Sequence, residues 1–148
     1  MEHHEWKREN DLISTDPERL DIDVIHQFLA DSYWCPGICR DLVETALSNS
    51  LCFGLYRLND AGSALQIGFA RIVTDYARFA YLLDVFVLEP YRGQGLGKWL
   101  IGCILQCPAL QQLPSIGLAT RDAHGLYETF GWERLASAEH LMRLQRQV

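Results

Sequence analysis

A glycine-rich segment, Arg92-Gly93-Gln94-Gly95-Leu96-Gly97, lies where an apolar run passes into an amphipathic helical pattern. The first N–H groups of a helix have no partner within the helix, and the helix dipole places partial positive charge beside them. Glycines let this backbone come close to an anion, and Arg92 and Lys98 add positive charge at the same end. The segment therefore predicts a phosphate-binding turn. The alternative is a glycine turn that only packs a helix against a sheet.

Two common phosphate loops are excluded by the spacing of this segment. A Walker A loop requires glycine at the position of Arg92 and serine or threonine at that of Trp99. The dinucleotide pattern Gly-x-Gly-x-x-Gly, started at either of the first two glycines, ends on Lys98 or on Leu100. The segment therefore belongs to neither class.

Hydrophobic periodicity around the segment predicts a mixed sheet with helices packed on it. The expected helices are 22–32, 41–47, 96–107 and 123–130, and the expected strands are 12–14, 51–58, 64–73, 79–88, 115–120, 132–135 and 141–144. The three strands between residues 51 and 88 have short connections, which favours an antiparallel meander. The first ten residues are expected to be loosely held. The length predicts a single domain, residues 1–148.

The composition excludes several classes of function. The chain has a net charge of −6 and scattered Lys and Arg residues, which argues against a nucleic-acid-binding surface. No apolar run reaches the ~18 residues of a membrane helix, and the polar N-terminus does not resemble a signal peptide. The five cysteines are an odd number and fit reduced thiols in the cytoplasm. Their helical spacing is unlike a zinc knuckle, so buried thiols and no metal site are expected.

Two segments resemble the signatures of the Gcn5-related N-acetyltransferases, the GNAT superfamily. The glycine segment is similar to the family's Gln/Arg-x-x-Gly-x-Gly/Ala signature, and it follows an apolar strand and an acidic-Pro turn as in the family. Downstream, residues 123–132 (Ala-His-Gly-Leu-Tyr-Glu-Thr-Phe-Gly-Trp) are similar to the family's Ala-x-x-Leu-Tyr-x-x-x-Gly-Phe segment. The resemblance covers about residues 64–132. It implies an α/β (α+β) fold of the GNAT type, with a mixed central sheet of about six to seven strands flanked by about four helices.

The resemblance also implies acetyl-CoA as the acetyl donor, with no metal. In the family two neighbouring parallel strands separate at a bulge, and the pantetheine arm of the cofactor pairs with the strand backbone there. The positions implied for the arm are Val85, Phe86 and Val87, and those implied for the pyrophosphate are Arg92, Gly93, Gln94, Gly95, Leu96, Gly97 and Lys98. Thr120 stands where the family commonly has Asn, so any side-chain contact to the cofactor arm falls to Thr120.

Direct attack of an amine on a thioester requires the loss of a proton, because only about one in 10³ lysine-like amines is neutral at pH 7. Asp84 is the only charged residue in the run 81–88, and strand alternation places it on the face of Leu82 and Phe86. A partly desolvated carboxylate at this position is a candidate general base. The alternative is an Asp that binds loose N–H groups at the bulge or orients a loop.

Tyr127 is placed by the resemblance beside the cofactor sulfur, where its hydroxyl donates a proton to the leaving thiolate. The alternative for Tyr127 is an aromatic wedge in the core. His124 lies one helical turn earlier and is either a second acid–base group or an exposed surface residue. Arg121 pairs either with Asp122 or with a cofactor phosphate.

Acceptor binding is implied at the connection between the first two helices and at a strand hairpin. The positions are Tyr33, Trp34, Asp75 and Tyr76. Aromatic rings beside a carboxylate suit a cationic or flat amine, and the alternative is that they anchor loops to the core. The expected function is N-acetylation of a small-molecule or peptide primary amine, by a monomer or a homodimer. A non-catalytic acyl-CoA-binding regulatory module and a purely structural domain are the alternatives.

Overall fold

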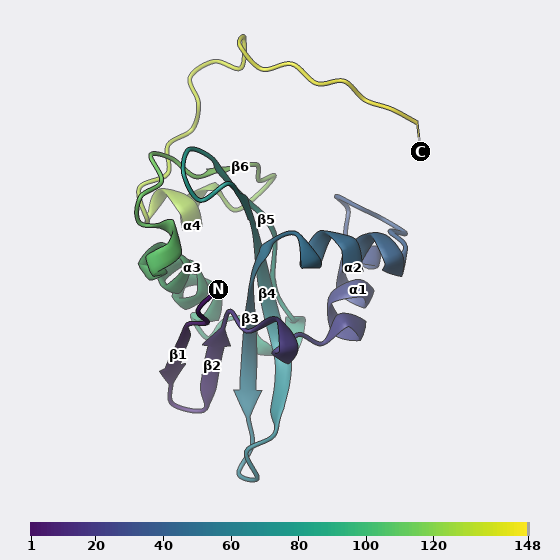
Figure 1. Ribbon diagram of the computed structural model, residues 1–148, viewed down its shortest axis with the longest axis vertical. Coiled ribbons are helices and arrows are strands. Elements are labelled where there is room, and N and C mark those ends of the chain that lie inside the picture. The colour runs from purple at the N-terminus through teal and green to yellow at the C-terminus, as the bar shows by residue number, and fades with distance from the viewer. Residues whose placement is uncertain (148) are drawn as a thin grey trace.

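The computed structural model describes residues 1–147 and contains a six-stranded sheet in the order β1-β2-β3-β4-β5-β6 (Figure 1). The strands are β1 (Glu5–Arg8), β2 (Asp11–Ser14), β3 (Leu51–Leu58), β4 (Ala64–Thr74), β5 (Ala80–Val87) and β6 (Gly117–Leu118). Neighbouring strands from β1 to β5 are antiparallel, and β5 and β6 are parallel. The mixed sheet and the antiparallel meander β3-β4-β5 predicted from the sequence are therefore confirmed.

Helices cover both faces of the sheet, and each face has its own apolar cluster. The helices are α1 (Ile22–Asp31), α2 (Arg40–Ser48), α3 (Leu96–Gln106) and α4 (His124–Glu128), with short 3-10 turns at Pro17–Arg19, Glu89–Tyr91 and Pro108–Leu110. In Figure 1, α3 and α4 lie on one side of the sheet, and α1 and α2 lie on the other. The cluster under α3 includes Leu100 and Ile104, and the cluster under α1 and α2 includes Leu29 and Phe69. β4 contributes side chains to both clusters, because successive side chains of a strand point to opposite faces.

A bulge in β5 reverses the side-chain alternation of this strand. Across the bulge β5 has one residue more than β4, and Asp84 adopts a φ of 55°, in the left-handed region that residues other than glycine rarely adopt. As a result Leu82 belongs to the cluster under α3, whereas Phe86 belongs to the cluster under α1 and α2. The expectation that Leu82, Asp84 and Phe86 share one face is therefore wrong. The extra residue breaks the simple alternation, and Asp84 lines a cavity on the α1–α2 side.

The N-terminal residues form a strand, so the expectation of a loosely held N-terminus is wrong. β1 pairs with β2 in register from Glu5–Ser14 to Arg8–Asp11. Trp6 of β1 stacks on Phe53 of β3, with ring centroids 6.2 Å apart and an interplanar angle of 29°. This aromatic contact attaches β1 to the core although its other side chains are charged.

The closing strands expected at residues 132–135 and 141–144 are absent from the described chain. Residues 133–147 are exposed, and Figure 1 shows them as an extended trace that leaves the sheet beyond α4. The strand expected at 115–120 is reduced to the two residues of β6, and the helix expected at 123–130 is reduced to α4. An alternating apolar pattern forms a strand only where an edge pairs with it, and no such pairing is present in residues 1–147.

All five cysteines are free thiols, and Cys52, Cys103 and Cys107 are buried. Burial raises the pKa of Cys52 to about 12, so this thiol stays protonated and packs as a small apolar side chain. Within residues 1–147, no group of three His, Cys, Asp or Glu side chains is placed to hold a metal ion. No helix in the same range is long and apolar enough to cross a bilayer.

Candidate active site

A gap opens between the parallel strands β5 and β6. The two strands are paired only at Tyr81 with Gly117 and at Leu82 with Leu118. β5 continues to Val87, so its edge on the β6 side has no strand partner beyond Leu82 in the described chain. The three residues expected to hold the pantetheine arm, 85–87, lie along this free edge. The sheet therefore separates at the place that the resemblance implies.

The glycine segment follows directly at the end of this free edge. Gly93 and Gly95 have φ values of 80° and 77°, which residues with a side chain adopt only under strain, and Gly95 is the N-terminal cap of α3. A Cβ atom built on Gly93, Gly95 or Gly97 meets no heavy atom within 4 Å, so open space lies in front of the turn. The N–H of Trp99 bonds to the carbonyl of Gly95 at 3.1 Å, whereas the N–H groups of residues 93–98 have no partner in residues 1–147. This turn can therefore bind an anion through its backbone.

The side chain of Gln94 is held by the sheet. Its Oε1 accepts a hydrogen bond from Nη2 of Arg57 at 2.9 Å, and Nε of Arg57 donates to Oδ1 of Asp11 at 2.6 Å. The guanidinium of Arg57 also lies 5.3 Å from the ring centroid of Tyr91. The ion pair and hydrogen bond fix the glycine turn against β2 and β3, and they leave the backbone of Gln94 as the group that can contact a cofactor. Arg57 and Asp11 are far from the segment in sequence, and no local pattern points to them.

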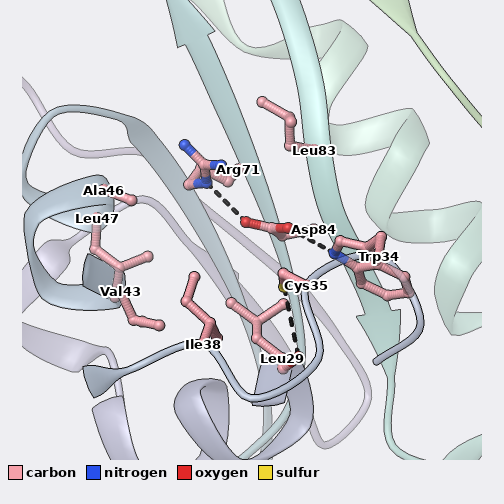
Figure 2. A pocket seen from close by; sticks show the side chains of 10 residues that line it. All are labelled: Leu29, Trp34, Cys35, Ile38, Val43, Ala46, Leu47, Arg71, Leu83 and Asp84. Atoms are coloured by element: carbon pink, nitrogen blue, oxygen red, sulfur yellow. Dashed lines mark hydrogen bonds and ion pairs between the residues drawn. The ribbon is translucent and has the colours of Figure 1, made fainter. Parts of the chain in front are cut away.

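Asp84 connects three separate elements at the bulge (Figure 2). Its Oδ2 accepts from Nε of Arg71 on β4 at 2.8 Å, and its Oδ1 accepts from Nε1 of Trp34 in the α1–α2 connection at 2.9 Å. Nη1 of Arg71 donates in turn to Oγ of Ser50 at 3.1 Å. The side chains of Arg71 and Asp84 are only 14% and 10% exposed. Both carboxylate oxygens are therefore occupied by protein donors, in a largely buried position.

Arg71 is the site residue that the sequence reading missed. A guanidinium within the mostly apolar run 64–73 is the signal that could have found it, because a charged residue inside a buried strand needs a partner. The partner itself lies on another strand.

A cavity of about 230 Å³ lies beside this ion pair on the α1–α2 side of the sheet. Arg71 and Asp84 form one wall, and Figure 2 shows side chains from α1, α2 and their connection around the rest. The other lining residues are Leu29, Trp34, Cys35, Ile38, Val43, Ala46, Leu47 and Leu83. The cavity thus combines an apolar interior with one polar wall.

A larger cleft of about 790 Å³ shares Trp34 with this cavity and reaches the end of β5. Its lining includes Tyr33, Leu88 and Arg92. Arg121, which follows β6, also lines the cleft, and its guanidinium lies 3.7 Å from the ring centroid of Tyr33. This contact bridges the β6 side of the gap and the α1–α2 connection. The structure therefore brings Tyr33 and Trp34 to the region of the bulge, and it shows Arg121 stacked on a ring rather than paired with Asp122.

Tyr127 lies in α4 and packs into the cluster under α3 with 7% of its surface exposed. Its ring meets Trp132 edge-on, with centroids 5.6 Å apart. Burial raises the pKa of Tyr127, and no hydrogen bond acts on its hydroxyl within residues 1–147. The side chain is therefore protonated at neutral pH and has no protein partner for its proton.

Thr120 and His124 flank the start of α4. Oγ1 of Thr120 accepts from the N–H of Ala123 at 3.0 Å, so this hydroxyl supports the turn before the helix. His124 is the first residue of α4 and is half-buried.

Asp75 and Tyr76 lie in the β4–β5 hairpin and line neither the cavity nor the cleft. Oδ1 of Asp75 accepts from the N–H groups of Ala77, Arg78 and Phe79 at 2.7 to 3.0 Å. These hydrogen bonds lower the pKa of Asp75. Its carboxylate thus stabilises the hairpin itself, and the structure does not bring this pair of residues together with Tyr33 and Trp34.

The known proteins that are similar to this chain are described as acetyltransferases. The family described as "Acetyltransferase (GNAT) domain" matches residues 52–134. A Gibberella zeae protein described as a candidate acetyltransferase is 34% identical over an alignment of 126 residues, and the match covers 75% of this chain and 70% of the relative. A crystal structure of a candidate GNAT acetyltransferase from Xanthomonas campestris pv. campestris is 43% identical, with a TM-score of 0.82 and 93% of each chain covered. A candidate acetyltransferase from Clostridium acetobutylicum, solved with acetyl-CoA, shares the fold at 14% identity and a TM-score of 0.61, covering 97% of this chain and 95% of that one.

Proposed function

The chain belongs to the GNAT acetyltransferases, and we propose that it transfers the acetyl group of acetyl-CoA to a primary amine by direct attack. The observation that carries this proposal is the free edge of β5, which runs directly into the N–H groups of residues 93–98, for which the described part of the chain supplies no partner. Strand backbone suits the amide groups of a pantetheine arm, and the start of a helix suits a pyrophosphate. The two features lie in the order in which the two parts occur in acetyl-CoA, which supplies the reactive thioester.

The proposed cofactor contacts are mostly made by backbone. The N–H and carbonyl groups of residues 85–87 pair with the arm, and the N–H groups of residues 93–98 hold the pyrophosphate. Arg92 and Lys98 offset its negative charge. Nε of Arg92 already donates to the carbonyl of Val87 at 2.8 Å, so Arg92 joins the end of the strand to the start of the turn.

In the proposed reaction a bond forms between the amine nitrogen and the acetyl carbon, and the bond from that carbon to sulfur breaks. Sulfur leaves as a thiolate. Tyr127 donates its phenolic proton to this thiolate, which suits the hydroxyl of a largely buried side chain that is protonated and has no partner within residues 1–147. The nitrogen loses one proton before attack and a second one as the amide forms.

We assign to Asp84 a positioning role in preference to that of the base. Its two oxygens hold Trp34 and Arg71, so that β5, β4 and the α1–α2 connection meet at the cavity. Each oxygen of this carboxylate already accepts a hydrogen bond, so a proton taken from the amine would have to compete with these two donors. The amine's protons therefore pass to water in the cleft. Direct proton uptake by Asp84 is the competing role, and the pH dependence of turnover distinguishes the two.

The acceptor is proposed to be a small-molecule amine with an apolar part. The cavity beside Asp84 is mostly lined by aliphatic side chains of α1 and α2, and its volume of about 230 Å³ suits a group of limited size. The carboxylate of Asp84 in its polar wall is proposed to face the amine nitrogen.

The test is a thiol-release assay with acetyl-CoA and a panel of primary amines that differ in apolar size and include a lysine peptide. Free CoA thiol should appear with the small apolar amines and not without an amine. A parallel thermal-unfolding measurement should show stabilisation by acetyl-CoA. Stabilisation without thiol release on any amine would instead support a non-catalytic acyl-CoA-binding module. If neither acetyl-CoA nor CoA stabilises the chain, both functions fail.

A further inference from the structure

The guanidinium of Arg121 is held on an aromatic ring and has no acidic partner. Its central carbon lies 3.7 Å from the ring centroid of Tyr33, which belongs to the α1–α2 connection. Asp31 and Glu89 line the same cleft, yet within residues 1–147 no carboxylate forms an ion pair with Arg121. Stacking uses the face of a guanidinium and leaves the N–H donors along its edge, which can bind a carboxylate through two parallel hydrogen bonds. Arg121 therefore presents an anion-binding edge to the cleft.

The pairing of β5 with β6 sets the position of Arg121 along the gap. The last paired residues are Leu82 and Leu118, and the two strands are parallel. Continuing this register puts residues 120–121 about level with residues 84–85 across the gap. The glycine turn comes later, beyond the end of β5. Arg121 is therefore placed beside the thioester end of the proposed acetyl-CoA site, away from its pyrophosphate end.

Two adjacent aromatic side chains connect Arg121 to Asp84. Nε1 of Trp34 donates to Oδ1 of Asp84 at 2.9 Å, and the rings of Tyr33 and Trp34 meet edge-on with centroids 5.1 Å apart. Trp34 lines both the cavity and the cleft, so the cavity that contains Asp84 adjoins the cleft that contains Arg121. A carboxylate and a guanidinium thus stand at the two ends of one aromatic row.

We propose that the acceptor is an amino acid, a small molecule with a carboxylate as well as a primary amine and an apolar part, and that Arg121 binds this carboxylate. The inference rests on the proposed transfer to an amine and adds a second anchor for the acceptor. The apolar part enters the cavity, the amine faces Asp84, and the carboxylate lies along the edge of the guanidinium. Two anchors fix the direction from which the amine meets the thioester, and an amine without a carboxylate lacks one of them.

A phosphate of the cofactor is the other anion that Arg121 could bind. Arg92 lines the same cleft, and its Nε donates to the carbonyl of Val87 at 2.8 Å, so a guanidinium already stands at the pyrophosphate end of β5. Tyr33 instead holds Arg121 at the α1–α2 connection, which borders the cavity proposed for the acceptor. These contacts favour the carboxylate of the acceptor.

The experiment compares acceptors with and without a carboxylate: L-leucine with L-leucinamide, and 6-aminohexanoic acid with 6-aminohexanamide. The amide also changes the basicity of the amine, so the quantity measured is the change in the acid-to-amide ratio of kcat/KM between parent and variant. We expect the parent to favour the acid of at least one pair, and Arg121→Gln to lower that ratio at least about tenfold. Arg121→Lys keeps the charge without the planar fork and should recover only part of the preference.

The matched control is Arg78→Gln, which removes the same charge from the β4–β5 hairpin, outside the cleft. It should keep the acid-to-amide ratio of the parent. Both arginines are exposed, so the thermal midpoints of the variants should stay close to that of the parent. The affinity of Arg121→Gln for acetyl-CoA, measured by calorimetry, should also be that of the parent.

Calorimetry with the same four compounds, on protein saturated with CoA, separates this inference from the proposed reaction. Tighter binding of the acid that depends on Arg121, without thiol release, supports the carboxylate site and contradicts the proposed transfer. Thiol release with equal ratios in parent and Arg121→Gln overturns the inference and leaves the transfer standing. A loss of acetyl-CoA affinity in Arg121→Gln, with the ratios unchanged, assigns Arg121 to a cofactor phosphate and also overturns it. Absence of both binding and thiol release for all four compounds overturns it as well.

Discussion

Arg71 and Asp84 form an ion pair across the bulge of β5, with 2.8 Å between Nε and Oδ2, at the wall of the cavity proposed to hold the acceptor. The pair joins β4 to the point at which β5 becomes free for a cofactor, and Trp34 extends it to the α1–α2 connection. A change at Asp84 therefore acts on the stability of the fold and on the shape of the site together.

Asp84→Asn should destabilise the protein by roughly 3 kcal/mol, because Arg71 is then left with little compensation in a largely buried position. Thermal or denaturant unfolding measures this loss. Turnover should fall, while the shape of the pH–rate curve on its acidic side should stay as in the parent. A curve that loses its rising limb in the variant would assign proton uptake to Asp84 and contradict the positioning role. Arg71→Met in the Asp84→Asn background is the matched control, and it should recover part of the lost stability.

Gly97→Ala and Gly95→Ala should affect stability in opposite directions. Gly97 lies in the first turn of α3 with open space around it, so alanine should raise helix stability by about 0.5–1 kcal/mol. Gly95 has a φ of 77°, so alanine there should cost about 1–2 kcal/mol. Both substitutions should weaken acetyl-CoA binding, because the added methyl group occupies the space in front of the turn. Calorimetry with acetyl-CoA and unfolding of the free protein separate the two effects.

The control for these glycines lies in the same helix. A Cβ on Gly102 meets only Cε1 of Phe130, at an ordinary contact distance of 3.8 Å, and the position is far from the start of α3. Gly102→Ala should keep the parent affinity for acetyl-CoA. If Gly97→Ala also keeps that affinity, the pyrophosphate does not lie on this turn.

Local features of the site could be predicted from the sequence because their chemistry lies within a few residues. The glycine turn is one case, since positive φ and a helix start are encoded by adjacent positions. β3 is another, because its apolar run ends at turn residues and matches the predicted bounds, 51–58. The hydrogen-bonded group of Asp84, Arg71 and Trp34 could not be predicted from neighbouring residues. Its partners lie 13 and 50 residues away, and one extra residue in β5 reverses the face on which Asp84 lies.

The two ends of the chain also show that a sequence pattern alone does not predict a strand. β1 contains three charged residues out of four, and only its pairing with β2 and the stacking of Trp6 make it a strand. Residues 141–144 have more apolar character, yet they form no strand in residues 1–147 because no edge is paired with them. Strand formation at these positions depends on a partner, and a single sequence does not specify the partner.

Tyr127→Phe should lower turnover about 10²-fold or more if the hydroxyl donates the proton to sulfur. The ring and its contact with Trp132 are retained, so unfolding should change little. Burial raises the pKa of Tyr127 above its ordinary value of 10.0, so the parent should lose turnover only as pH rises beyond 10 and the phenol ionises. That alkaline limb should be missing in Tyr127→Phe. Equal turnover in parent and variant would leave Tyr127 a role in packing alone.

The raised pKa of Tyr127 also predicts a change in stability with pH. The folded state holds the phenolic proton more tightly than the unfolded state, so this contribution is complete below the unfolded pKa of about 10 and is lost as pH rises through the higher folded value. Denaturant unfolding at alkaline pH should show a decline in stability that is smaller in Tyr127→Phe. Identical declines in the two proteins would assign the effect to other groups, such as the buried Tyr56, whose pKa is also raised by burial.

Ala46→Phe should exclude the acceptor from the cavity beside Asp84. Ala46 lines this cavity from α2, and the volume of about 230 Å³ leaves room for a phenyl ring with little strain on the core. The KM for an apolar amine should rise at least about tenfold, which corresponds to the loss of roughly 1.4 kcal/mol of binding. Binding of acetyl-CoA should be unchanged because β5 and the glycine turn are untouched.

The control is Leu42→Phe, which enlarges a residue of the same helix that is 59% exposed. It should leave both the KM for the amine and the affinity for acetyl-CoA as in the parent. If Ala46→Phe also leaves the KM for the amine unchanged, the acceptor binds outside this cavity, and the larger cleft next to Tyr33 becomes the place to substitute.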